Sequence, residues 1–208
     1  MKLLLAAVLV LMLISLAQAA PETRQLGPFN VSFDMNTNIN YTIEKPEVKG
    51  DSSATPYLLG IKTNNTTWAS IGITEYKNLV DSTIQMHKSL TGMSLVLSGI
   101  NVTAIDDKVI GKDGKQGYLA TGVPIANLNA PAGTMFYQAT YWLDSKDCDC
   151  GAVSVGQTRV VITSTYPQDV TMNLMSSILV EKGTDAGQKA SSMITPTSSS
   201  DMPPGAAS

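Results

Sequence analysis

The stretch MFYQATYWL, residues 135–143, decides the fold class of this chain. Its side chains fall into two alternating sets, with Tyr137, Ala139 and Tyr141 in one and Gln138, Thr140 and Trp142 in the other. A period of two is typical of a β-strand, in which successive side chains point to opposite faces of the sheet. We expect the tyrosines to close one edge of the core and Trp142 to face solvent.

Segments with the same period lie on both sides of this stretch. Strands are expected at residues 29–33, 41–43, 57–61, 69–73, 102–110, 117–123 and 153–164. Asn64-Asn65 and Asp113-Gly114 separate neighbouring pairs, and these residue types favour the tight turns of hairpins. The order of strands therefore predicts an antiparallel sheet.

Two segments have the period of an amphipathic helix. The first has an apolar stripe at spacings of three and four: Leu79, Thr83, Met86, Leu90, Met93 and Leu97. The second begins near Pro167, ends at Lys182-Gly183 and has Val170, Leu174 and Ile178 on one face. We expect both helices to pack on the sheet, in an α+β fold.

The methionines and aromatic residues of these elements allow two interpretations each. Core packing is the preferred role for the methionines at helical spacing, and a soft ligand-binding groove is the alternative; they are Met86, Met93, Met172 and Met175. Core packing is likewise preferred to an aromatic platform for a sugar or a partner, which would comprise Trp68, Tyr137, Tyr141 and Trp142.

The N-terminus has the three-part pattern of a secretory signal peptide, assigned to residues 1–19. Lys2 precedes an apolar run from Leu3 to Ile14, and Ala17-Gln18-Ala19 supplies the cleavage site. The run is shorter than the about 20 apolar residues of a transmembrane helix. We therefore expect an exported protein, secreted or at the cell surface, with no membrane span after cleavage.

The rest of the chain divides into three parts. Residues 20–27 are interpreted as a leader, and residues 28–183 as one α+β domain with an antiparallel sheet and two main helices. Residues 184–208 are rich in Ser, Thr, Ala, Pro and Gly, and such a composition buries too little apolar surface to order itself. We expect a disordered tail.

The net charge of the chain and its possible glycosylation sites indicate which class of partner it binds. The chain has 14 Lys and Arg against 17 Asp and Glu, so it offers no positive excess to nucleic acid. Asn-x-Ser/Thr triplets, the acceptor sites of N-glycosylation, occur at Asn30, Asn40, Asn64, Asn65 and Asn101. An unknown protein or a cell-surface component is the expected partner.

The layout resembles that of the PsbP-like fold family. The resemblance rests on GPFNVSFDMNTNINYTI, WASIGITEY and TRVVITSTYPQDVTMNLMSSI, and it extends over the region from about Phe29 to Lys182. It implies an opening hairpin, a helix, and a sheet whose last strand runs into a C-terminal helix, arranged as an α/β/α sandwich. Families of this shape are mostly non-enzymatic, and no functional residue is carried over from them.

Cys148 and Cys150 form the one local cluster that suggests chemistry. In an exported protein we expect them to be oxidised, as a disulfide clip at a hairpin tip. A bridge between two chains, a thiol-redox site and a metal site are the alternatives. In the metal site, oxygen ligands would come from Asp144, Asp147 and Asp149.

The sequence offers no other catalytic set. His87 is the sole histidine, and a lone histidine on a helix is more often a surface or packing residue than a base. Nucleophile-elbow, phosphate-loop and dinucleotide motifs are not found, and no cofactor or metal is expected. These patterns favour a non-enzymatic exported domain, a surface-associated binding or structural module. The alternatives are a carrier of a small apolar ligand in a groove between helix and sheet, and a thiol-redox protein that uses Cys148 and Cys150.

Overall fold

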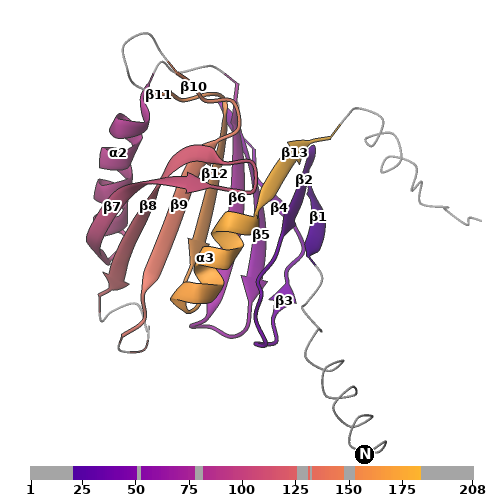
Figure 1. Ribbon diagram of the computed structural model, residues 1–208, viewed down its shortest axis with the longest axis vertical. Coiled ribbons are helices and arrows are strands. Elements are labelled where there is room, and N and C mark those ends of the chain that lie inside the picture. Colours follow the sequence, from indigo (N-terminus) through magenta and orange to yellow (C-terminus); the bar gives the residue numbers. More distant parts are fainter. Residues whose placement is uncertain are drawn as a thin grey trace, which may run out of the picture.

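The computed structural model describes residues 21–50, 53–77, 82–125, 131, 133–147 and 153–183. Within these ranges the protein is a mixed α+β domain with two helices and a predominantly antiparallel arrangement of strands, as the sequence predicts. Figure 1 shows a large sheet with a smaller one in front of it.

Eight strands of the described chain form the large sheet. They are β3 (Thr42–Ile43), β4 (Glu47–Val48), β5 (Ala54–Lys62), β6 (Trp68–Tyr76), β7 (Ile100–Ile110), β8 (Lys115–Pro124), β9 (Phe136–Trp142) and β12 (Thr158–Ser164). The main order is β3-β5-β6-β12-β9-β8-β7, and β4 also pairs with β5. The stretch at residues 135–143 thus supplies β9, which lies between β8 and β12. A short ribbon of β10 (Lys146–Asp147) and β11 (Val153–Ser154) lies apart from this sheet.

A second sheet has the order β1-β2-β13, with β1 (Glu22–Leu26), β2 (Phe29–Phe33) and β13 (Leu179–Lys182). The segment interpreted as a leader therefore contains a strand. Leu26 is fully buried, and Gly27 makes the turn into β2 with a φ of 62°. Four polar residues in a row on β1 hide this strand from a search for alternating hydrophobicity, because only its last residue is buried.

The helices are α2 (Ile84–Leu97) and α3 (Gln168–Ser177). The prediction that the second helix continues to Lys182 is wrong. Ile178 has the extended backbone angles φ −62° and ψ 135°, and the next four residues pair with β2 as strand β13. The sequence signal for the helix end, Lys182-Gly183, also stands at the end of strand β13 and does not distinguish the two outcomes.

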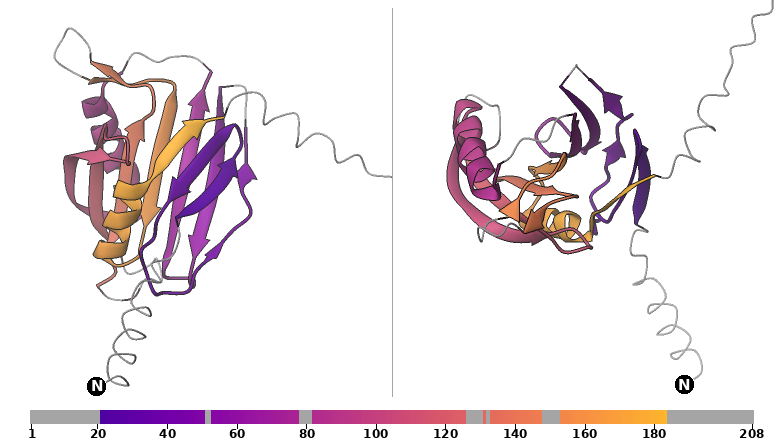
Figure 2. Two further views of the ribbon diagram at one scale, coloured as in Figure 1. Left: turned by 45° about the vertical axis from the view of Figure 1, so that its right-hand side comes forward. Right: turned by 90° about the horizontal axis from the view of Figure 1, so that it is seen from above.

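The main core lies between the large sheet on one side and the small sheet with α3 on the other (Figure 2). Ile71 of β6 pairs with Ile162 of β12, and neither side chain has exposed surface. Tyr137 and Tyr141 of β9 face the same core, which confirms the register expected for that strand. Leu174 of α3 is fully buried against it.

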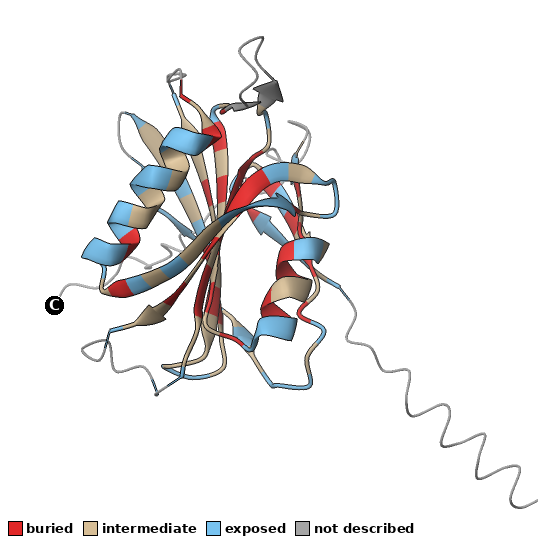
Figure 3. Cartoon of the chain, turned by 60° about the vertical axis from the view of Figure 1, so that its left-hand side comes forward, coloured by how far each residue is buried: buried red, intermediate tan, exposed pale blue. Residues whose placement is uncertain are grey.

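Helix α2 lies on the opposite face of the large sheet, near β7 and β8. The stripe that the sequence assigns to its buried face is exposed, by 54% at Met86, 53% at Leu90, 64% at Met93 and 86% at Leu97. Figure 3 shows α2 mostly exposed, whereas one side of α3 is buried. The helix instead contacts the sheet through Ile84 and Leu95, which are buried.

Candidate functional site

Two cavities open beside α2, on the face of the large sheet that the small sheet does not cover. The first, of about 180 Å³, is lined by residues that include Tyr76, His87, Leu90 and Trp142. The second, of about 370 Å³, lies beside the C-terminal half of the helix, where Leu95 is one of its walls. We call the space along α2 that contains both cavities the α2 groove.

Strand register determines the floor of the α2 groove. Arg159 of β12 pairs with Thr74 of β6 on one side and with Trp142 of β9 on the other. The next row joins Val161 to Thr140, so the side chains of these two rows share one face. The floor therefore has a row with the long side chains of Arg159 and Trp142 next to a row of smaller residues.

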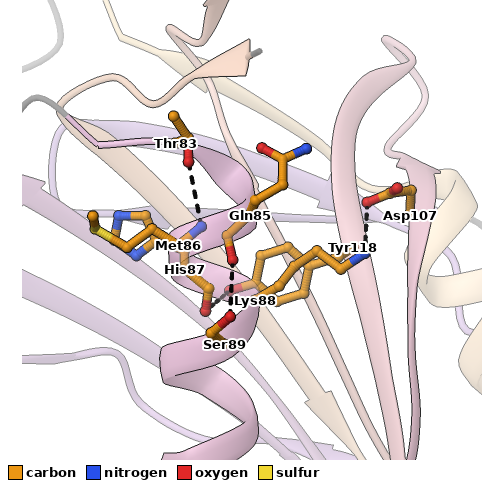
Figure 4. Close-up of polar contacts among 8 residues, drawn as sticks. All are labelled: Thr83, Gln85, Met86, His87, Lys88, Ser89, Asp107 and Tyr118. Carbon is orange, nitrogen blue, oxygen red and sulfur yellow. Dashed lines mark hydrogen bonds and ion pairs between the residues drawn. The ribbon is translucent and has the colours of Figure 1, made fainter.

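Tyr118 of β8 and Asp107 of β7 hold α2 over this floor, and Figure 4 shows their contacts with His87 and Lys88. The Tyr118 hydroxyl lies 2.7 Å from Oγ1 of Thr91 and donates to the carbonyl of His87 at 3.3 Å. On the outer side, the Lys88 ammonium pairs with Asp107 of β7 at 2.9 Å. Thr83 caps the helix, because its hydroxyl accepts the backbone N–H of Met86. The helix is thus held at the β7 side of the sheet, and its other side is left open.

His87 lies in the wall of the first cavity. Its Nε2 is 2.9 Å from Oγ of Ser82, and its ring lies 4.8 Å from the ring of Trp142. Burial of the ring lowers the pKa of His87 below its usual 6.5, and the positive charge of Arg159 lowers it further. The imidazole is therefore neutral at neutral pH.

A serine and a histidine at this distance have the spacing of a nucleophile and its base. A triad also needs a group that orients the other ring nitrogen. Among the described residues, no carboxylate is hydrogen-bonded to His87. The contact with Trp142 agrees with the expectation that this histidine is a packing residue.

The second cavity has an aromatic and aliphatic wall. The rings of Trp68 and Phe136 meet edge to face at 6.4 Å, and Leu95 and Ile100 belong to the same buried cluster. Gln138 and Thr165 add polar groups to the lining. Apolar walls with a few polar groups are typical of small-molecule sites.

The aromatic residues chosen from the sequence are not brought together as one platform. Tyr137 and Tyr141 face the main core, whereas Trp68 and Trp142 face the α2 groove. The prediction that Trp142 is exposed is wrong: it is 1% exposed, because α2 covers it. The sequence places Trp142 on the correct face but does not reveal that a helix lies over that face.

The four methionines chosen from the sequence also differ in burial. Met175 is buried and Met172 packs against the main core, as expected. Met86 and Met93 are exposed, which corrects the prediction that they are core residues. Met86 lines the first cavity, which agrees with the alternative of a ligand-binding groove.

The predicted cysteine site lies outside the part of the chain that the structure describes. Cys148, Cys150 and Asp149 lie outside the described residues, so the disulfide, redox and metal interpretations stay predictions. Asp144 is described, and its carboxylate accepts the backbone N–H groups of Gln157 at 2.8 Å and Thr158 at 3.0 Å. Among the described residues, no three His, Cys, Asp or Glu side chains are grouped closely enough to hold a metal ion.

The asparagines of the five Asn-x-Ser/Thr triplets are exposed. Asn30 lies on β2 and Asn101 on β7. Asn64 makes a turn in which its Oδ1 accepts the backbone N–H groups of Thr66 and Thr67. Exposure meets one requirement for a glycan acceptor.

None of the helices in the described ranges has the length and apolar character that crossing a membrane requires. The chain matches no family model, and comparison with curated proteins and with solved structures likewise gives no match. Membership of the PsbP-like fold family stays a prediction.

Proposed function

We propose that the protein is a non-enzymatic exported domain that binds a small apolar ligand in the α2 groove. The observation that carries this proposal is the exposed apolar stripe of α2, which begins in the wall of the first cavity at Met86 and Leu90. Contiguous apolar surface of this kind marks binding sites more often than ordinary protein surface.

The size and lining of the cavities support a small ligand. An engineered apolar cavity of about 150 Å³ in another protein binds benzene, so the 180 Å³ beside His87 accommodates a ring or a short alkyl chain. Burying apolar surface contributes about 25 cal/mol per Å². A ligand that covers Met86 and Leu90 gains this contribution without displacing any described part of the chain.

Export and surface association belong to the same proposal. They are supported by the signal-peptide pattern of residues 1–19 and by the exposure of the five asparagine acceptors. A PsbP-like α/β/α sandwich is the finer description that we propose for the fold. Its support is the position of α2 and α3 on opposite faces of the large sheet.

The groove is tested with N-phenyl-1-naphthylamine, a neutral apolar dye that fluoresces when it leaves water. We expect saturable binding to the mature protein, and about tenfold weaker binding to Leu90→Glu, because a charge beside the bound dye lacks a partner. Val96→Glu is the matched control, since Val96 lies on the same helix, is 57% exposed and does not line the groove.

Both variants change exposed side chains, so their melting temperatures should stay close to that of the parent. Absence of saturable dye binding, or equal loss in both variants, would contradict the groove proposal. The non-enzymatic part is tested separately with a fluorophosphonate, which labels activated serines. Covalent labelling at Ser82 that disappears in His87→Gln would overturn it.

A further inference from the structure

Arg159 lies beside the α2 groove and is a cation for which the described residues supply no charged partner. Its guanidinium lies 5.5 Å from the centre of the Tyr76 ring, in a cation–π contact. Its Nε is buried and makes no hydrogen bond, and no carboxylate pairs with it among the residues that the structure describes. Buried donors are normally satisfied, so this one calls for a partner.

The residues that the structure describes around Arg159 leave its charge uncompensated. It lines a hollow of about 310 Å³ on the face of β5, β6 and β12. Glu47 and Lys49 also line this hollow, but they pair with each other at 2.9 Å. The hollow therefore carries a net positive charge.

The same hollow adjoins the apolar part of the groove. Tyr76 contacts Arg159 and also lines the first cavity with Met86, Leu90 and Trp142. In the row of side chains next to Arg159, Thr140 is 1% exposed, and its Oγ1 has no hydrogen-bond partner. Two unsatisfied polar atoms thus lie on the same sheet face, beside an apolar cavity.

We propose that the ligand of the α2 groove is an amphiphilic carboxylate, whose apolar body lies beside α2 and whose carboxylate binds Arg159. This inference rests on the proposed function and adds the chemical class of the ligand. The planar guanidinium matches a carboxylate through two parallel N–H···O bonds, and the Tyr76 ring holds it from one side. A neutral ligand of the same apolar shape supplies no counter-charge to the guanidinium of Arg159.

The experiment compares sodium octanoate with 1-octanol, which have the same chain length and differ in the head group. Each displaces N-phenyl-1-naphthylamine from the mature protein at pH 7.5, and binding of octanoate is also measured directly by calorimetry. We expect octanoate to bind more tightly than octanol. Arg159→Met should weaken the binding of octanoate about tenfold, which corresponds to the lower range for a hydrogen bond to a charged group. The affinity for octanol should be unchanged.

Two further variants control for net charge and for folding. Arg159→Lys retains the charge and should keep part of the preference for octanoate. Lys112→Met removes an exposed charge from the β7–β8 turn and should leave the preference intact. If a loss of stability in Arg159→Met obscures the result, Arg159→Lys and the salt dependence of octanoate binding still decide it, because screening weakens only the charged ligand.

The outcomes separate this inference from the proposed function. Equal affinity for octanoate and octanol, or an octanoate preference that survives in Arg159→Met, overturns the inference and leaves the apolar groove standing. Failure of the dye, octanoate and octanol to bind overturns both.

Discussion

The hydroxyl oxygens of Ser164 and Thr171 lie 2.7 Å apart in the main core, and neither side chain has exposed surface. Thr171 also donates to the carbonyl of Tyr166, whose own N–H donates to Oγ of Ser164. These three bonds join the end of β12 to the first turn of α3. The polar side chains in this part of the core are thereby satisfied, and α3 starts at a defined angle to the sheet.

Thr171→Val should lower the free energy of unfolding by about 1–3 kcal/mol, because it removes the hydroxyl and leaves buried polar groups unsatisfied. Thr171→Ser keeps the hydroxyl and should lose less. Urea unfolding of the two variants and the parent measures the difference. Equal losses in the two variants would contradict this expectation, because they would mean that the methyl group of Thr171 contributes as much as its hydroxyl.

The two helices should respond very differently to the same truncation. Leu174→Ala in α3 removes a fully buried side chain and should cost about 2–5 kcal/mol. Leu97→Ala in α2 removes a side chain that is 86% exposed and should change stability by less than about 0.5 kcal/mol. Thermal and urea unfolding test this pair. If Leu97→Ala lowered the free energy of unfolding as much as Leu174→Ala, the apolar stripe of α2 would have to be packed against the rest of the protein.

The stability of the protein should fall as the pH drops below 6.5. The folded state holds the pKa of His87 below its usual 6.5, so the unfolded chain takes up the proton first as the solution is acidified. The loss begins near pH 6.5 and continues until the pH reaches the lowered pKa. His87 is the sole histidine, so the effect is assignable.

Urea unfolding between pH 7.5 and pH 5 measures this loss, and His87→Gln is the control because glutamine does not titrate. The variant should show a flatter dependence of stability on pH than the parent. Identical dependence in both proteins would show that carboxylates alone produce the slope.

Sequence periodicity predicts the strands well where one face of a strand is buried. In β2, Phe29 and Val31 are buried and alternate with the exposed Asn30, as a period of two predicts. Periodicity misses β1, because Leu26 is the only buried residue on that strand. It also misses β13: Ile178 continues the helical spacing of α3, and pairing with the distant β2 makes the following residues a strand.

The candidate site is harder to predict, since periodicity identifies an apolar face of a helix but not what covers it. The stripe through Met86 and Leu90 is correctly apolar, yet it is Leu95 that contacts the sheet. The role of Arg159 has no sequence signal at all, because an arginine in a strand is ordinary. Its significance depends on the strands beside it and on the lack of a charged partner among the described residues.

The pairing of β13 with β2 also sets the order in which the domain is completed during synthesis. The backbone N–H of Asp34, just after β2, donates to Oγ of Ser177, 143 residues later in the chain. The hairpin of β1 and β2 emerges from the ribosome first, and an isolated two-stranded hairpin is marginally stable at best. Until Leu179 is made, the nascent chain keeps an open strand edge on β2, and Phe29 and Phe33 lack their final packing partners. A chaperone that recognises open strand edges therefore has the most time to bind at the N-terminal end of the domain.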